Sequence, residues 1–255
     1  MPRIQHTIIL ETASSTNTYA AEHADMLPRP TLIVAKEQTQ GLGQRGNTWD
    51  ALPGDITASL IVDIPAGPNG TQAVAPEYSF VLNQVASLAV CEALAALGVS
   101  AQVKWANDII VSNRKICGLL ISTALKGDAL HSAVIGYGLN IAARPQSPAH
   151  YAPPAIGLNE LVASHVDSAQ LAESIAERII KQLDRLAHSE HDEIHAEYLA
   201  KLFWREGYHP FSIHATGERI EARIVGILPS GQLQLELRDG QRRNFLFREL
   251  NHCIA

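Results

Sequence analysis

The sequence predicts an α+β fold in which a mixed sheet with flanking helices precedes a small C-terminal β module. Short β-branched segments alternate with longer alanine- and leucine-rich segments through the first part of the chain. From Phe211 onward, apolar and polar residues alternate, and turns are expected at Pro229–Gly231 and Asp239–Gly240. A chain of 255 residues has room for one main domain and a small appendage, so we expect domains at 1–207 and 208–255.

The main domain begins with segments whose ends are marked by polar residues. Residues 6–13 form a short apolar run, and the Ser and Thr residues that follow would cap a helix over 14–26. Two further strands are expected at 31–39 and 55–64, since both are rich in β-branched residues. Residues 77–98 carry alanine and leucine at helical spacing and end at a glycine, which favours a helix stop. The remaining expected elements are two strands within 101–125 around a turn at Ser112–Arg114, a strand at 131–142, a Pro-, Ala- and Ser-rich surface loop at 143–167, and amphipathic helices near 168–187 and 190–203.

Composition excludes several classes of protein. Hydrophobic residues make up 46% of the chain and charged residues 18%, which is typical of a soluble globular protein. The formal net charge of −6 and the pI near 6.0 give no sign of a nucleic-acid surface. We see no signal peptide and no run of about 18 apolar residues, so no membrane span is expected. Three cysteines without CxxC spacing predict neither a zinc site nor a disulfide, but reduced thiols in a cytoplasmic protein.

The stretch EQTQGLGQRGNTW, residues 37–49, is the first candidate for chemistry. Gly41, Gly43 and Gly46 leave backbone N–H groups unshielded, which permits the close approach of a phosphate. Arg45 would add a charge-assisted contact. The spacing matches neither the dinucleotide fingerprint nor the P-loop. A flexible turn between two strands explains the same glycines.

A second candidate is VKWANDII, in which a lysine, a tryptophan, an amide and a carboxylate share an apolar setting. If the strand continues, Lys104 and Ala106 face one side of it while Trp105 and Asn107 face the other. The alternative is a strand end that turns into a loop, with Asn107 and Asp108 capping the turn.

Two more segments leave strand faces open. Lys115 enters an apolar strand with Gly118 three residues later, so a ligand could approach there, although a solvated hairpin lysine is the simpler interpretation. Gly136 and Gly138 occupy alternate positions of one strand, which leaves one face bare, as the wall of a pocket requires.

Three polar residues, Ser15, Thr16 and Asn17, stand at the first strand-to-helix junction, where helix capping accounts for one of them. No Ser/His/Asp or Cys/His arrangement is evident. The candidates are therefore cations, amides and backbone N–H groups, a set that suits phosphoryl or nucleotidyl chemistry.

Taken in order, SSTN, EQTQGLGQRGNTW, VKWANDII, RKICGLLI and GYGLNI follow one another as they do in the biotin–protein ligases. The chain resembles a biotin–[acetyl-CoA-carboxylase] ligase over nearly its whole length, most densely over 8–142. The resemblance implies a class II synthetase-like catalytic domain and an SH3-like C-terminal module. It also implies a reaction in which biotin, ATP and Mg²⁺ give biotinyl-5′-AMP, and a lysine of the biotin carboxyl carrier protein then takes the biotin.

The resemblance assigns residues by position. Lys115 is the leading catalytic residue because it matches the lysine that holds the biotin carboxylate and then the anhydride. The other catalytic candidates are Arg45, Lys104 and Asp108, the last for the transfer step. The biotin-binding candidates are Ser15, Thr16, Asn17, Gln38, Leu42, Gly43, Gln44, Lys115, Gly118, Gly136 and Gly138. The nucleotide-binding candidates are Gly41, Arg45, Trp49, Asn107 and Asn140. No protein metal ligand is assigned.

Two departures from the family pattern matter. Leu42 and Gln44 occupy places where the family loop commonly has arginine, so phosphate neutralisation is thinner and Leu42 would add apolar cover over biotin. Ala106 stands where proline is usual. The chain begins at the catalytic domain, so we expect a ligase without an N-terminal DNA-binding domain, with no nucleic-acid or membrane partner.

The activity has alternatives that the sequence leaves open. A lipoate–protein ligase or octanoyltransferase shares the fold, and loss of loop arginines would also suit a non-catalytic biotinyl-AMP sensor. Monomer and homodimer, the identity of the carrier and the role of the C-terminal domain are equally open.

Overall fold

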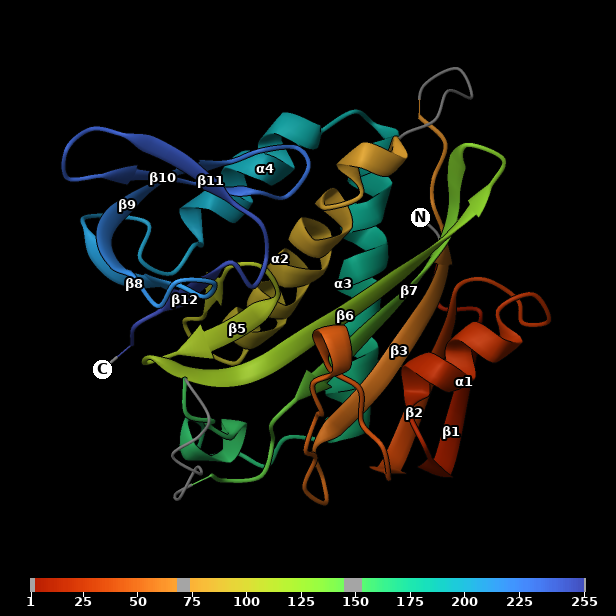
Figure 1. The fold of residues 1–255 in the computed structure, drawn as a ribbon. Helices are drawn as coiled ribbons and strands as arrows, with labels where there is room; N and C mark the ends of the chain where they lie inside the picture. Colours follow the sequence, from red (N-terminus) through yellow and green to blue (C-terminus); the bar gives the residue numbers. More distant parts are fainter. Residues whose placement is uncertain (1–2, 68–73, 145–152, 255) are drawn as a thin grey trace.

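The computed structural model describes residues 3–67, 74–144 and 153–254, and a seven-stranded mixed sheet forms its centre (Figure 1). The strand order is β1-β2-β3-β7-β6-β5-β4, with β1 and β2 parallel and all other neighbours antiparallel. The strands are β1 (His6–Ala13), β2 (Thr31–Gln38), β3 (Ile56–Asp63), β4 (Gln102–Lys104), β5 (Asp108–Val111), β6 (Arg114–Lys126) and β7 (Ala129–Leu139). The predicted mixed sheet is confirmed.

Helices cover the two faces of this sheet unequally. In Figure 1, α2 (Val81–Ala96) and α3 (Ser168–Ala187) lie side by side against one face, and α4 (His191–Ala200) follows α3. Among the α-helices of the described residues, the short α1 (Thr16–His23) alone packs on the other face, against β2, β3 and β7. The remainder of that second face is left open, and the pocket described below lies there.

The helix α2 belongs to a long, strongly apolar segment of the described residues. The segment Pro76–Ala96 is 21 residues long, with a mean hydropathy of 1.5, which is enough to cross a membrane by length and composition. However, 67% of its most apolar window is buried inside the protein. A helix that packs against both a sheet and α3 is apolar nearly all round, and burial accounts for its hydropathy.

The C-terminal module is a five-stranded antiparallel sheet in the order β11-β10-β9-β8-β12. Its strands are β8 (His209–Ile213), β9 (Arg219–Ile227), β10 (Leu233–Leu237), β11 (Arg242–Phe245) and β12 (Leu250–His252). The module packs firmly on the main domain: Trp105 Nε1 donates to Gly231 O at 3.0 Å, and a Cβ at Gly231 would lie 2.7 Å from the Phe80 ring. The two parts therefore share one continuous core.

The structure also corrects two local expectations. The stretch 101–125 forms three strands rather than two, because β4 ends at Lys104 and β5 begins at Asp108. The alternation expected over Lys104 to Asn107 is wrong, since residues 105–107 form a turn and Lys104 pairs directly with Asp108.

The expected surface loop at 143–167 is also only partly exposed, because some of its residues are buried. Residues 145–152 lie outside the described part. After them, Ile156 and Leu158 are buried, and Ile156 N donates to Lys115 O at 2.9 Å. Residues 154–158 therefore pack behind β6 and hold it in place.

Candidate active site

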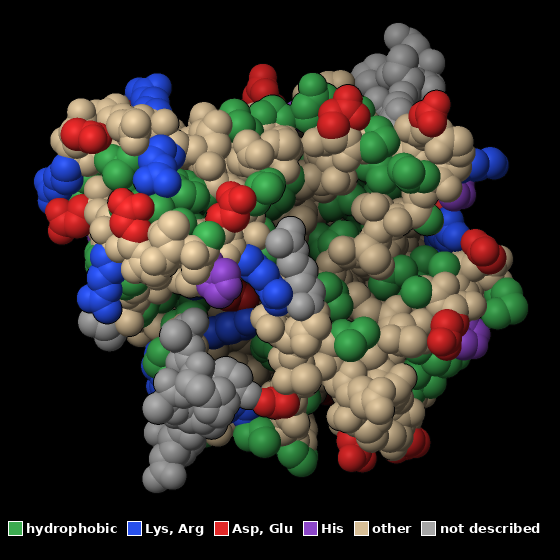
Figure 2. All heavy atoms as spheres, viewed as in Figure 1, with side chains coloured by type: hydrophobic (Ala, Val, Ile, Leu, Met, Phe, Trp, Pro, Cys, Tyr) green, Lys and Arg blue, Asp and Glu red, His purple; other side chains and the backbone are tan. Residues whose placement is uncertain are grey.

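A cavity of about 660 Å³ lies on the open face of the sheet, within the size range of small-molecule sites. In Figure 2, Lys and Arg side chains gather around the hollow between the C-terminal module, at upper left, and the main sheet. The predicted residues that line the cavity are Ser15, Thr16, Asn17, Gln38, Leu42, Gly43, Gln44, Trp49, Lys104, Asn107, Asp108, Lys115, Gly118, Gly136 and Gly138.

One end of the cavity, the neutral end, is a closed network of uncharged polar groups. Both the N–H and the hydroxyl of Thr16 donate to Gln38 Oε1, at 2.8 and 3.2 Å. The Ser59 hydroxyl lies 2.8 Å from Thr16 Oγ1 and 2.5 Å from Asn17 Oδ1, and Asn17 Nδ2 donates to Leu120 O at 3.0 Å. Because each group holds its neighbour, the network is rigid before any ligand arrives.

Ser15 and two residues of β3 add further polar groups to the neutral end. Ser15 stands at the N-cap of α1, yet its side chain makes no capping bond and instead lines the cavity. Sequence reasoning missed Thr57 and Ser59, which are 3% and 0% exposed on the pocket side of β3. The alternation in ITASLIVD was the available signal, because polar residues at every second position of an apolar strand mark one face.

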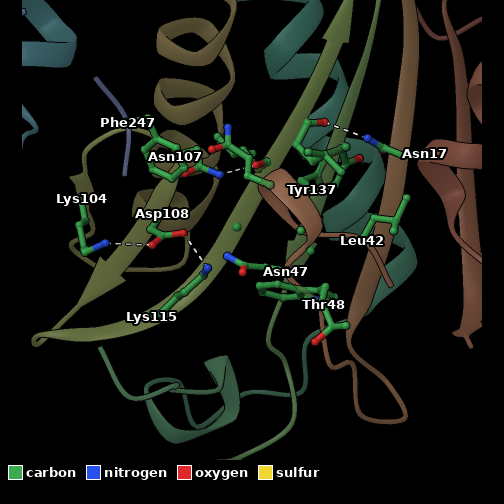
Figure 3. A pocket seen from close by; sticks show the side chains of 18 of the residues that line it. Asn17, Leu42, Asn47, Thr48, Lys104, Asn107, Asp108, Lys115, Tyr137 and Phe247 are labelled. Carbon is green, nitrogen blue, oxygen red and sulfur yellow. Dashed lines mark hydrogen bonds and ion pairs between the residues drawn. The ribbon is translucent and has the colours of Figure 1, made fainter. Parts of the chain in front are cut away.

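The opposite end, the charged end, is built by the β4–β5–β6 hairpins. Asp108 lies between two lysines, with Lys104 Nζ 3.2 Å from Oδ2 and Lys115 Nζ 2.6 Å from Oδ1 (Figure 3). Burial alone would raise the pKa of Asp108, but the Lys115 and Lys104 ammonium groups outweigh burial and lower it to about 2. The carboxylate is therefore ionised at neutral pH and fixes the positions of both cations.

The backbone of Lys115 is held from behind. Its N–H donates to Pro154 O at 2.7 Å, and its carbonyl accepts from Asn140 Nδ2 at 3.1 Å. Asn140 Nδ2 also donates to Ile156 O at 3.2 Å. Asn140 is thus placed behind Lys115, outside the described cavity lining, and its predicted contact with a nucleotide stays a prediction.

The bare faces predicted at the strand glycines are occupied by the side chains of Asn17 and Trp49. A Cβ at Gly136 would lie 2.0 Å from Asn17 Oδ1, and one at Gly138 would lie 2.3 Å from the Trp49 ring. A Cβ at Gly118 would lie 3.0 Å from the same ring. These glycines therefore admit Asn17 at the neutral end and Trp49 near the charged end.

Trp49 forms the floor between the two ends of the cavity. The Lys115 ammonium lies 5.4 Å from its ring centroid, within the range of a cation–π contact. The indole N–H is buried and has no hydrogen-bond partner among the described residues. Asn107 completes this side, because its Nδ2 donates to Leu119 O at 2.6 Å.

The glycine loop folds back on itself above the cavity. Gly43 N donates to Asn47 O at 2.7 Å, Trp49 N donates to Gly41 O at 2.9 Å, and Gln44–Gly46 form one 3₁₀ turn. A Cβ at Gly41 would lie 2.2 Å from Trp49 O, so this glycine is required by close backbone approach. The side chain of Arg45 lies outside the described part of the structure, so its predicted phosphate contact stays a prediction.

The C-terminal module contributes a part of the site that sequence reasoning missed. Its side chains that line the cavity are His214, Phe247, Arg248, Leu250 and Asn251. Trp105, singled out in the sequence without a role, lines it as well. The alternation that predicted the module carries no information about which turn faces the main domain, so no local signal identified these residues.

Metal binding and thiol reactivity depend on how the His, Cys, Asp and Glu side chains are grouped and buried. No cluster of three or more His, Cys, Asp or Glu side chains suited to a metal occurs in the described ranges. Cys91, Cys117 and Cys253 are all free thiols. Burial raises the pKa of Cys91 to about 12, which keeps that thiol protonated and unreactive.

This architecture is that of solved biotin protein ligases. The structure of the Aquifex aeolicus biotin protein ligase in complex with biotin and ATP matches with a TM-score of 0.75 and 21% identity, covering 98% of this chain and 100% of that one. The Leishmania major biotin protein ligase in complex with biotinyl-5-AMP matches with a TM-score of 0.65 and 23% identity, over 96% and 100% of the two chains.

The sequence establishes the family as well as the fold. Residues 9–140, just over half of the chain, match the biotin/lipoate A/B protein ligase family, and the chain belongs to it. A bifunctional ligase/repressor BirA of Bacillus subtilis is 30% identical over 67% of this chain and 51% of its own length. A biotin–[acetyl-CoA-carboxylase] ligase of Paracoccus denitrificans is 31% identical over 55% and 57%. The chain thus matches these curated relatives over about half of their length.

Proposed function

We propose that this chain is a biotin–protein ligase that activates biotin with ATP and then transfers it to a lysine of a biotin carboxyl carrier protein, such as that of acetyl-CoA carboxylase. The observation that carries the proposal is the division of one cavity into a neutral polar end and a cationic end. A ligand that fits both ends has an uncharged polar head at one side and a carboxylate, later a phosphate ester, at the other.

The neutral end favours biotin over lipoate or octanoate, although the family description covers ligases of both biotin and lipoate. The ureido ring of biotin carries a carbonyl acceptor and N–H donors, whereas a dithiolane ring or an alkyl end offers no comparable groups. Burying an apolar end there would leave the Ser15 hydroxyl, which lines the cavity and makes no capping bond, without a partner, at a cost of roughly 1–3 kcal/mol. The named relatives support the same choice.

The charged end suits the first chemical step. A biotin carboxylate oxygen attacks the α-phosphorus of ATP, an anhydride P–O bond forms, and the bond to the β-phosphate breaks to release pyrophosphate. Two anions must approach each other, and Lys115 and Lys104 lower that repulsion. Asp108 keeps both ammonium groups at the cavity wall, so we assign it a positioning role.

In the second step the amine of the carrier lysine attacks the acyl carbon, the C–O bond to the phosphate breaks, and AMP leaves while the amine loses a proton. The folded glycine loop above the cavity would shield the anhydride from water until the carrier arrives. Mg²⁺ would enter with the triphosphate, because Asp108, the acidic side chain among the described cavity residues, is engaged by two lysines. We also propose a cytoplasmic location, which three free thiols support.

A transfer assay tests the proposal. The full chain is incubated with an apo carrier domain, ATP and Mg²⁺, with biotin, lipoate or octanoate in separate arms, and the carrier is weighed by mass spectrometry. We expect the carrier mass to rise by one biotinyl group in the biotin arm alone. Transfer of lipoate or octanoate instead would overturn the choice of substrate, and biotin binding without turnover would identify a sensor.

A further inference from the structure

One tight turn of the C-terminal module, residues 246–249, reaches into the cavity. Leu246 N donates to Glu249 Oε2 at 2.7 Å, and Glu249 N donates back to Leu246 O at 3.0 Å. His214 N donates to Glu249 O at 2.9 Å, which ties the turn to the end of β8. These bonds fix the position of Arg248 within the turn.

Arg248 has an unusual backbone for a residue with a side chain. Its φ is +75°, in the left-handed region where glycine is favoured. Non-glycine residues persist in that region where the surrounding structure holds them, and they gather at functional sites. Glycine would fit this turn with less strain, so an arginine here indicates that its side chain has a role.

The Arg248 side chain contacts the glycine loop. Its Nη2 donates to Gln44 O at 2.8 Å, a bond between residues 204 positions apart in the sequence. Gln44 O also accepts from Asn47 N at 3.3 Å, and that bond closes the 3₁₀ turn of the loop. The guanidinium of the C-terminal module thus binds the carbonyl around which the loop turns.

Arg248 also changes the charge of the cavity. Lys104 and Lys115 share the negative charge of Asp108, so these three side chains together leave one net positive charge. Arg248 lines the same cavity and makes no ion pair with a described residue, which raises the net charge of these four side chains to two. Because Leu42 and Gln44, the loop side chains on either side of Gly43, are uncharged, Arg248 adds substantially to the positive charge at this wall of the cavity.

We propose that Arg248 is a positioning residue that holds the glycine loop over the phosphate side of the cavity and so slows the loss of bound adenylate. The proposal rests on the proposed function, because the adenylate is its ligand. It gives the C-terminal module a defined part in the reaction: the module supplies a bond that holds the loop and one further positive charge beside it.

The clasp can be tested without any catalysis. Hydrogen–deuterium exchange across residues 41–49 of the ligand-free full chain is compared among wild type, Arg248→Met and Arg248→Gly. Loss of a charge-assisted bond should speed exchange there about tenfold in both variants. Arg248→Gly should melt at or above the wild-type temperature, because glycine accepts the left-handed backbone. Arg238→Ala, an exposed arginine of the same module, removes the same charge and should leave exchange unchanged.

A second measurement connects the clasp to its ligand. Biotinyl-AMP is formed in place from biotin and ATP, and its release is followed after dilution into unlabelled biotin. Both Arg248 variants should release the adenylate about tenfold faster, while affinity for biotin alone changes by less than about twofold. Unchanged exchange in residues 41–49, or release unchanged within about twofold, overturns the role of Arg248. Absence of adenylate in the wild type, with the clasp still seen by exchange, overturns the proposed function and the retention role, and leaves a structural clasp.

Discussion

The two ends of the cavity are built on different physical principles. At the neutral end, Thr16, Asn17 and Ser59 bond to one another and to the backbone, and the network joins α1, β2, β3 and β6. At the charged end, Lys104 and Lys115 lie partly exposed around Asp108, and their bonds can be exchanged for bonds to an incoming anion.

This difference separates recognition from chemistry. A rigid neutral network discriminates between ligands, because its groups hold one another in place and cannot adapt to a head group that lacks matching donors and acceptors. Cations held by a carboxylate are preorganised for developing negative charge and contribute most in a water-poor site. We therefore expect mutations at the neutral end to affect mainly the affinity for biotin, and mutations at the charged end to affect mainly the rate of adenylation.

The largest effect is expected from Lys115→Ala. Removing one preorganised donor at a reacting anion lowers rates by about 10²–10³ in other enzymes, and we expect at least this loss in pyrophosphate release. Biotin binding should weaken by no more than about tenfold, because the neutral end remains intact. Stopped-flow detection of pyrophosphate and calorimetry with biotin measure the two quantities.

Lys126→Ala is the matched control, because Lys126 is exposed at the far end of the same strand, β6. It should leave both quantities unchanged. Pyrophosphate release near the wild-type rate in Lys115→Ala would remove Lys115 from the reaction and place the chemistry elsewhere.

An intermediate effect should come from two neighbouring glycines on one face of β7. Gly136→Ala pushes a methyl group toward Asn17, and Gly138→Ala pushes one toward Trp49. We expect the first to raise the KM for biotin about tenfold and the second to raise the KM for ATP by a similar factor, since about 1.4 kcal/mol corresponds to tenfold. Steady-state kinetics with each substrate varied in turn provide the measurement.

Gly226→Ala serves as the control, because its Cβ would meet only the flexible end of Gln234, at 3.2 Å. If both β7 variants raise the same KM equally, the two ends are one coupled unit and the proposed division between them is wrong.

The sequence could predict what depends on local pattern. Strands β1, β2, β3 and β7 were predicted because each carries its own run of β-branched residues between turn signals. The three-residue β4 was missed because so short a strand has no periodicity, and only its pairing with β5 defines it. The composition of the segment around Ile156 predicts a surface loop, because the bonds that bury it join it to Lys115, which is distant in sequence.

The site divides along the same line. Lys115, Gly136 and Gly138 carried signals of their own in an apolar strand, and the resemblance supplied their roles. The alternation in β3 marks the face on which Ser59 lies, but its bonds to Thr16 and Asn17 depend on the packing of α1, and the contact of Arg248 depends on the docking of one module on another. Information of that kind lies in the packing of the whole chain and has no counterpart in any short window of sequence.

The smallest effect concerns the acid stability of the charged end. Although burial favours the neutral acid, Lys115 and Lys104 lower the pKa of Asp108 to about 2, whereas a free aspartate titrates near 3.9. The unfolded chain therefore binds this proton first as the pH falls. The stabilisation, about 2 kcal/mol, is complete above about pH 4 and is lost as the pH falls toward 2.

Urea unfolding from pH 5 to 2.5 tests this. The free energy of unfolding should fall less with acid in Asp108→Asn than in wild type and in Asp128→Asn, an exposed control. Equal pH slopes in all three proteins would mean that the lysines around Asp108 are held by their own strands, and that its charge serves the reaction alone.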